Sequence, residues 1–198
     1  MPSRFRNPLA DLEIAKAELQ SMGNTTSFRE FSESWQNFLM RLERAWQTSA
    51  RIIRPMKGAQ QWFAPYKELR KTDPLLDYLR FARNAEIHDG DSTICKPIAI
   101  NVKDKSGKGI LLKNITARLD GDDLTIDMGT WDIENFVDAQ LIPSDPEITT
   151  FRTREGEHAP PKKHLRKRIK SKHPVYIAEL GLDFYSTFVK EADSRYGI

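Results

Sequence analysis

The chain has few of the residues that build disulfide-stabilised or metal-dependent proteins. Its 198 residues include one cysteine, Cys95, which excludes an internal disulfide and favours a reducing compartment. No His or acid lies near Cys95 in the sequence, so we expect a buried, unreactive thiol. There is no zinc-ligand spacing, and the acidic stretch 120–123 lacks the alternating ligands of a calcium loop. We therefore expect no metal or other cofactor.

Long hydrophobic segments are also missing. No apolar run approaches the roughly 20 residues of a bilayer-spanning helix, and residues 1–6 lack the apolar centre of a signal peptide. Hydrophobic residues make up 39% of the chain and charged residues 30%, as is typical of a globular protein of one large or two small domains. We expect a cytoplasmic protein with no membrane partner.

Positive charge is concentrated in one short segment. Residues 160–173 contain seven Lys or Arg and no acid, and without them 24 basic residues face 28 acidic ones, a net charge of −4. Such a block attracts polyanions and suits contact with an RNA or DNA backbone. A flexible linker is an equal alternative, and a nuclear-import signal is a third. The substrate-binding residues that the block predicts are Lys162, Lys163, Arg166, Lys167, Arg168, Lys170 and Lys172.

Residues 1–91 have the periodicity of a helical bundle. Asn7 and Pro8 predict the start of a first helix, and Gly23 its end. Residues 27–30 form a capping box for a second helix that runs to Pro55. A shorter helical piece is expected around residues 62–69. The second helix carries an apolar stripe at three- and four-residue spacing, typical of a packed core: Phe28, Phe31, Trp35, Phe38, Leu42, Trp46 and Ile53.

Residues 92–198 have a different pattern. Extended segments at 93–102, 110–119 and 124–128, separated by turns, predict an antiparallel β-region that continues less clearly to residue 152. Pro174 predicts the start of a terminal helix whose apolar face should dock on the sheet or the bundle. The fold class is therefore α+β, with a helical bundle at 1–91 and an antiparallel β-region with a docked C-terminal helix at 92–198.

One helix, at residues 73–90, has a polar face suited to phosphate chemistry. Thr72 or Asp73 can cap it, Pro74 suits its first turn, and Gly90 can end it. At 100° per residue its core face holds Leu75, Tyr78, Leu79, Ala82 and Ala85. The opposite face holds Asp77, Arg80, Arg83, Asn84 and His88, with Ile87 among them.

The segment Arg83-Asn84-x-x-x-His88 resembles the motif of the HEPN family (higher eukaryotes and prokaryotes nucleotide-binding domains), in which Arg and a following polar residue precede a His. Looser matches occur at Arg152 to His158 and at Arg166 or Arg168 to His173, but only the Arg83 segment has the adjacent Asn within a helix. The resemblance covers about residues 8–90, where a long aromatic-rich helix precedes the motif. Many catalytic members have a Tyr two residues after the His, where this chain has Gly90.

The resemblance implies metal-independent RNA cleavage, with attack by the 2′-hydroxyl and a 2′,3′-cyclic phosphate product. It assigns catalytic roles to Arg83, Asn84 and His88. Arg80, on the same polar face of the helix, is a further candidate for substrate binding. It also implies a homodimer in which two motif helices face one another. The function we expect is an endoribonuclease of the toxin or anti-phage defence type, whose partners are RNA and, for a toxin, an antitoxin protein.

Three other interpretations stay open. The domain could be a non-catalytic RNA-binding or dimerisation module, or it could use the same polar face to bind a nucleotide. The polar face could also be purely structural. In that case His88 would interact with the helix end, and Arg80 and Arg83 would form surface ion pairs with Asp77 and Glu86.

Overall fold

The computed structural model forms two compact units, Met1–Ile94 with Ile148–Ile198, and Cys95–Glu147. It describes residues 3–89, 92–104, 109–113, 116–120, 123–127 and 136–197. Within these, only the backbone is described for residues 88–89, 98–102, 104 and 109–143. The division made from the sequence grouped residues 148–198 with the β-region, whereas their contacts place them with the helices.

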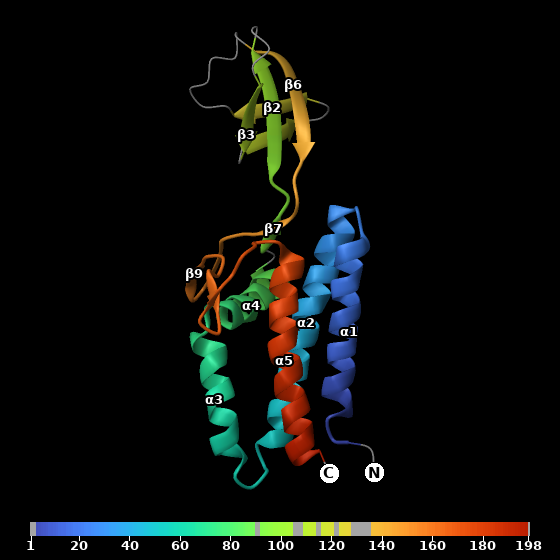
Figure 1. The fold of residues 1–198 in the computed structure, drawn as a ribbon, viewed down its shortest axis with the longest axis vertical. Coiled ribbons are helices and arrows are strands. Elements are labelled where there is room, and N and C mark those ends of the chain that lie inside the picture. The colour runs from blue at the N-terminus through green and yellow to red at the C-terminus, as the bar shows by residue number, and fades with distance from the viewer. Residues whose placement is uncertain are drawn as a thin grey trace. The chain divides into compact units, whose positions relative to one another are not determined.

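The first unit is a helical bundle with a C-terminal helix packed on it. Together with the antiparallel strands of the second unit, it confirms the α+β prediction. Its helices are α1 (Arg6–Asn24), α2 (Phe28–Ile53), α3 (Ala59–Thr72), α4 (Pro74–Asn84) and α5 (Pro174–Tyr196). A π-helical turn, η1 (Ala85–Asp89), follows α4. Helix α5 packs along α1 and α2, so the end of the chain completes the bundle that its beginning starts (Figure 1).

The aromatic stripe of α2 lies in the core, as its spacing predicts. Trp35 and Phe38 are fully buried, and Trp46 packs against Phe188 of α5 with ring centroids 4.7 Å apart. Burial of large aromatic side chains is the main source of stability in such a bundle.

The helix starts agree only in part with the sequence signals. Ser27 caps α2 and accepts a hydrogen bond from the Glu30 N–H, but the Glu30 carboxylate binds the Thr25 hydroxyl and not the Ser27 amide. The prediction that Asn7 caps α1 is wrong. The helix begins earlier, at Arg6, and no side chain caps it.

The second unit is built of antiparallel strands. Strands β2 (Ile98–Asp104), β3 (Gly109–Lys113) and β6 (Phe136–Pro143) form a sheet in the order β3-β2-β6, and β4 (Thr116–Asp120) pairs with β5 (Asp123–Asp127). The single strand expected at 110–119 is therefore two strands in different sheets. The centres of the turns predicted at 103–109 and 120–123, and the predicted helix end at Gly90, lie outside the described residues, whereas the outer residues of both turns belong to strands.

Short strands mark where the chain leaves and re-enters the helical unit. Strand β1 (Ile94–Cys95) pairs with β7 (Glu147–Ile148), and the chain then forms the hairpin β8 (Phe151–Thr153) and β9 (Gly156–His158). A second hairpin, β10 (Lys163–His164) and β11 (Lys167–Arg168), precedes α5. Cys95 is exposed, so the expectation of a buried thiol is wrong. In the described part of the chain, no helix is both long and apolar enough to cross a membrane.

Gly181 sets how closely α5 approaches the rest of the bundle. A Cβ atom added there would lie 2.5 Å from Leu79 Cδ1 and 3.6 Å from Leu42 Cδ1, both buried side chains. We expect Gly181→Val to lower the free energy of unfolding by about 1–3 kcal/mol through overpacking. Gly23→Val is the control, because no atom lies within 4 Å of its Cβ position. Equal thermal melting temperatures for the two variants would contradict this packing.

Candidate functional site: the motif helix and a basic hairpin

The motif helix begins at a side-chain cap. The Asp73 side chain accepts hydrogen bonds from the amides of Leu75 and Leu76 at 3.1 and 3.2 Å, and Pro74 occupies the first turn. The predicted core face is buried and is wider than expected, since Leu76 and Phe81 are buried as well. This face fixes the rotation of α4 and so sets which residues point away from the core.

The end of the motif helix differs from the prediction. Regular α-helix stops at Asn84, and residues 85–89 form the π-turn η1. Such turns are rare and occur frequently at functional sites. Because a π-turn takes more residues per turn than an α-helix, it brings position 88 closer in angle to position 83 than an α-helix would.

Arg83 and Asn84 are half-buried neighbours. Arg83 Nη1 donates a hydrogen bond to Asn84 Oδ1 at 3.0 Å, so the amide of Asn84 orients this guanidinium. The backbone of His88 lies in η1, but its side chain lies outside the described part of the structure. The structure thus brings two of the three predicted catalytic side chains into contact.

The π-turn is held to α2 by a polar network around Thr93. The Glu86 carboxylate accepts hydrogen bonds from the Thr93 amide and hydroxyl, both at 2.7 Å, and from Gln36 at 2.9 Å. Trp35 Nε1 donates to the Thr93 hydroxyl at 2.9 Å, and Thr93 is fully buried. Glu86 therefore has a structural role in positioning the motif.

Residues 163–168 of the basic segment form a hairpin, so the middle of the segment is not a flexible linker. Lys163 pairs with Arg168 and His164 with Lys167 across β10 and β11. The two turn residues, Leu165 and Arg166, have φ of 46° and 68°, as the common two-residue hairpin turn with two positive φ values requires. All seven predicted substrate-binding cations of the segment are exposed: Lys162, Lys163, Arg166, Lys167, Arg168, Lys170 and Lys172.

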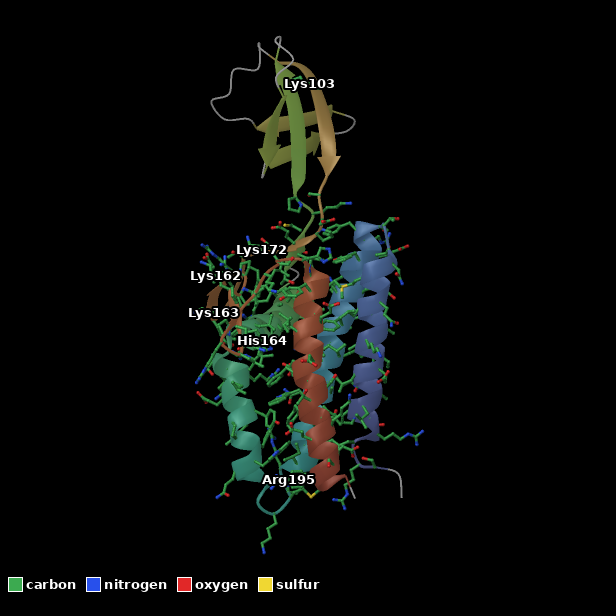
Figure 2. All side chains as sticks on the ribbon, viewed as in Figure 1. Lys103, Lys162, Lys163, His164, Lys172 and Arg195 are labelled. Carbon is green, nitrogen blue, oxygen red and sulfur yellow. The ribbon has the colours of Figure 1, made fainter. Side chains whose placement is uncertain are left out.

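The Asp73 carboxylate also forms two contacts with the basic hairpin. His164 Nδ1 lies 2.8 Å from Asp73 Oδ1, and the Leu165 amide donates to Asp73 Oδ2 at 2.7 Å. Figure 2 shows His164 over α4, with Lys162 and Lys163 farther out on the hairpin. Burial raises the pKa of Asp73, but the hydrogen bonds from His164, Leu165 and Leu76 outweigh burial, so the net pKa lies below its ordinary value.

The hairpin and the motif residues lie at opposite ends of the same helix. Asp73 precedes α4, whereas Arg83 and Asn84 are in its last turn, about 15 Å away at 1.5 Å per residue. The sequence could not give this separation, because it depends on how residues 160–173 return to the bundle.

Arg80, the predicted substrate-binding residue of the motif helix, belongs to a cluster that includes an unexpected histidine. His158 of β9 stacks on Phe81 with ring centroids 3.8 Å apart, and the Arg80 guanidinium lies 3.9 Å from the same ring centroid. Arg80 also pairs with Asp77 at 2.8 Å, as the three-residue spacing suggests. The only sequence signal for His158 was the loose match that begins at Arg152.

The pKa of His158 lies below its ordinary value. Burial is the main cause. Asp77 opposes the shift, and the positive charge of Arg80 reinforces it. The imidazole is therefore mostly neutral at pH 7 and can accept a proton.

No metal site is evident in the part of the chain that the structure describes, where no group of three or more His, Cys, Asp or Glu side chains could hold a metal ion. Comparisons of the chain with protein-family models, with curated proteins and with solved structures gave no match. The site therefore has to be interpreted from its own residues.

The double role of Asp73 can be tested by its effect on stability. We expect Asp73→Ala to lower the free energy of unfolding by about 2 kcal/mol or more, because it removes a helix cap and leaves His164 without its buried partner. Asp73→Asn should cost less, since Asn still caps a helix. The exposed Asp145→Ala is the control.

The contribution of Asp73 to the free energy of unfolding should depend on pH. Because the pKa of Asp73 is lowered by folding, its carboxylate stabilises the fold above its ordinary value of 3.8 and loses that effect as the pH falls through the folded value. The stability difference between the wild type and Asp73→Ala should therefore be largest at neutral pH and shrink below pH of about 4. Denaturant unfolding from pH 3 to pH 7 measures it, and a constant difference would contradict the assignment.

Proposed function

We propose that this protein is a metal-independent endoribonuclease of the toxin or anti-phage defence type, acting as a homodimer through the motif helix. The HEPN resemblance at Arg83, Asn84 and His88 supports the reaction type. One observation of the structure carries the proposal. The helix that bears these residues also holds, through Asp73, the hairpin at 163–168, and this hairpin and the residues beside it carry seven exposed cations.

The hairpin supports RNA as the partner. Its cations project from a short β-ribbon that is fixed to the bundle at both His164 and the Leu165 amide. Leu165 at its tip is 44% exposed and offers an apolar contact among these charges. A fixed array of Lys and Arg neutralises successive phosphates without the cost of ordering a flexible segment.

The proposed chemistry needs three groups. A base removes the proton of the RNA 2′-hydroxyl, whose oxygen attacks the adjacent phosphorus while the bond to the 5′-oxygen breaks. A general acid protonates that leaving oxygen, which gives a 2′,3′-cyclic phosphate and a 5′-hydroxyl. Arg83 would stabilise the charge on the phosphorane, and His88 would transfer a proton. Asn84 would keep the Arg83 guanidinium in place, as their hydrogen bond favours.

A non-catalytic RNA-binding module is the second candidate. The hairpin favours it independently, since binding through the hairpin does not require Arg83 or His88. Measurements of cleavage and of binding on the same variants separate the two candidates.

The catalytic proposal predicts loss of cleavage in two single variants. We expect Arg83→Ala and His88→Ala to reduce RNA cleavage by ~100-fold or more, because each removes a group that acts on the transition state. Asn84→Ala should be milder, and activity should persist in EDTA. Gel assays that resolve cyclic-phosphate ends measure this, with Arg51→Ala, an exposed arginine of α2, as the control. Full activity in His88→Ala, or its loss in EDTA, would overturn the mechanism.

The hairpin predicts a salt-dependent RNA affinity. Replacing the seven cations between residues 162 and 172 by Gln should weaken RNA binding and flatten the plot of log K against log salt, by up to about 0.7 for each lost contact with single-stranded RNA. The rate of cleavage of fully bound RNA should barely change. The exposed Lys16, Lys57 and Lys190 replaced by Gln serve as the control. An unchanged slope in the seven-fold variant would remove the hairpin from the RNA interface.

A further inference from the structure

A groove of about 240 Å³ between α2, α3 and α4 has an unusual lining. Neither the predicted catalytic residues nor the hairpin cations contribute to it. Its residues come from α2 and the position just after it, from α3, and from one position of α4: Trp46, Gln47, Ala50, Arg54, Phe63, Lys67, Arg70, Lys71 and Arg80. Five of these nine side chains are cationic and none is acidic.

The cation at the buried side of the groove is fixed in place. Arg70 is 8% exposed, donates from Nε to the Tyr185 hydroxyl at 3.1 Å and pairs with Glu43. Its guanidinium lies 4.8 Å from the Trp46 ring centroid. A buried arginine held in this way offers its remaining donors without loss of side-chain entropy.

The other four cations leave the groove positively charged. Arg80 pairs with Asp77, but its buried Nε has no hydrogen-bond acceptor among the described residues. Arg54, Lys67 and Lys71 are exposed and form no ion pair with a described carboxylate. With Glu43 and Asp77 counted against Arg70 and Arg80, the net local charge is +3.

Apart from Gln47, the rest of the lining is apolar and aromatic. Trp46, Ala50 and Phe63 are buried, and the rings of Trp46 and Phe63 lie 5.1 Å apart. A second groove of about 380 Å³ between α1 and α5 differs in its charges, since Glu13, Glu179 and Asp183 line it together with Lys16 and Lys190. Of these two grooves, the one at α3 has the excess of positive charge.

We propose that the groove between α2, α3 and α4 binds a nucleoside monophosphate. A phosphate group would bind Lys67, Lys71 or Arg54 by charge-assisted hydrogen bonds. A bare phosphate would leave the apolar wall unused, whereas a base can contact those parts of Trp46 and Phe63 that line the groove. The volume of about 240 Å³ lies just below the usual range of ligand pockets. The proposal does not depend on RNA cleavage.

Isothermal titration calorimetry of the full chain tests this site with AMP, GMP, CMP and UMP, and with inorganic phosphate and adenosine as partial ligands. We expect at least one nucleotide to bind at least about tenfold more tightly than phosphate or adenosine, because only a nucleotide contacts both the cations and the apolar lining of the groove. The double variant Lys67→Gln/Lys71→Gln should weaken that nucleotide at least about tenfold. Both lysines are exposed, so the variant should remain folded, and its melting temperature checks this.

The matched control is Lys16→Gln/Lys190→Gln, which removes two lysines from the groove between α1 and α5 and should leave nucleotide affinity unchanged. Three results would overturn the proposal: no nucleotide binding at millimolar concentration, phosphate binding as tightly as the nucleotides, or equal weakening by the two double variants. A fourth would be tighter binding of a short RNA than of any mononucleotide at the same lysines. That result would assign the groove to a polymer.

Discussion

The buried carboxylate of Asp73 is the contact on which the arrangement of the functional surface depends. Its oxygens satisfy two amides at the start of α4, one amide of the basic hairpin and the ring of His164. The residues that it joins are 91 positions apart in the sequence. An unpaired carboxylate buried at this place would be strongly destabilising, so the cap and the hairpin stabilise each other. The same contact converts a run of basic residues into a fixed array.

A second polar network fixes the other end of the motif helix. Thr93 accepts from Trp35 and donates to Glu86, and the Tyr78 hydroxyl donates to the backbone carbonyl of Thr149 at 2.8 Å. The Thr149 amide in turn donates to the Thr93 carbonyl. Position 93 comes just before the inserted strands and position 149 just after them. These contacts join the two chain segments that flank residues 95–147 to each other and to α4.

The parts of the fold that could be predicted are those fixed by local signals. The Ser27 cap, the aromatic stripe of α2 and the Asp73-Pro74 start of α4 follow from short-range chemistry, and so does the core face of α4. The π-turn could not be predicted, because it depends on Glu86 reaching Thr93 and Gln36. The hairpin at 163–168 was also missed. Leu165 and Arg166 are not the Gly or Asn residues that usually occupy two positive-φ positions, and the tertiary contacts of His164 and Leu165 with Asp73 compensate for this.

In the candidate site, too, the residues could be predicted from the sequence but their arrangement in space could not. That arrangement bears on the kind of substrate that the proposed function requires. The motif residues could be identified from their spacing, and the seven cations from their density. Their positions at opposite ends of α4 come only from the fold. A ligand that contacts both must span about 15 Å along the helix, which exceeds the length of a mononucleotide and is covered by several nucleotides of a strand. On the proposed function, a polymer would therefore engage the hairpin and the motif together. A small nucleotide would bind elsewhere, at a site that combines charge and aromatic surface within a single groove.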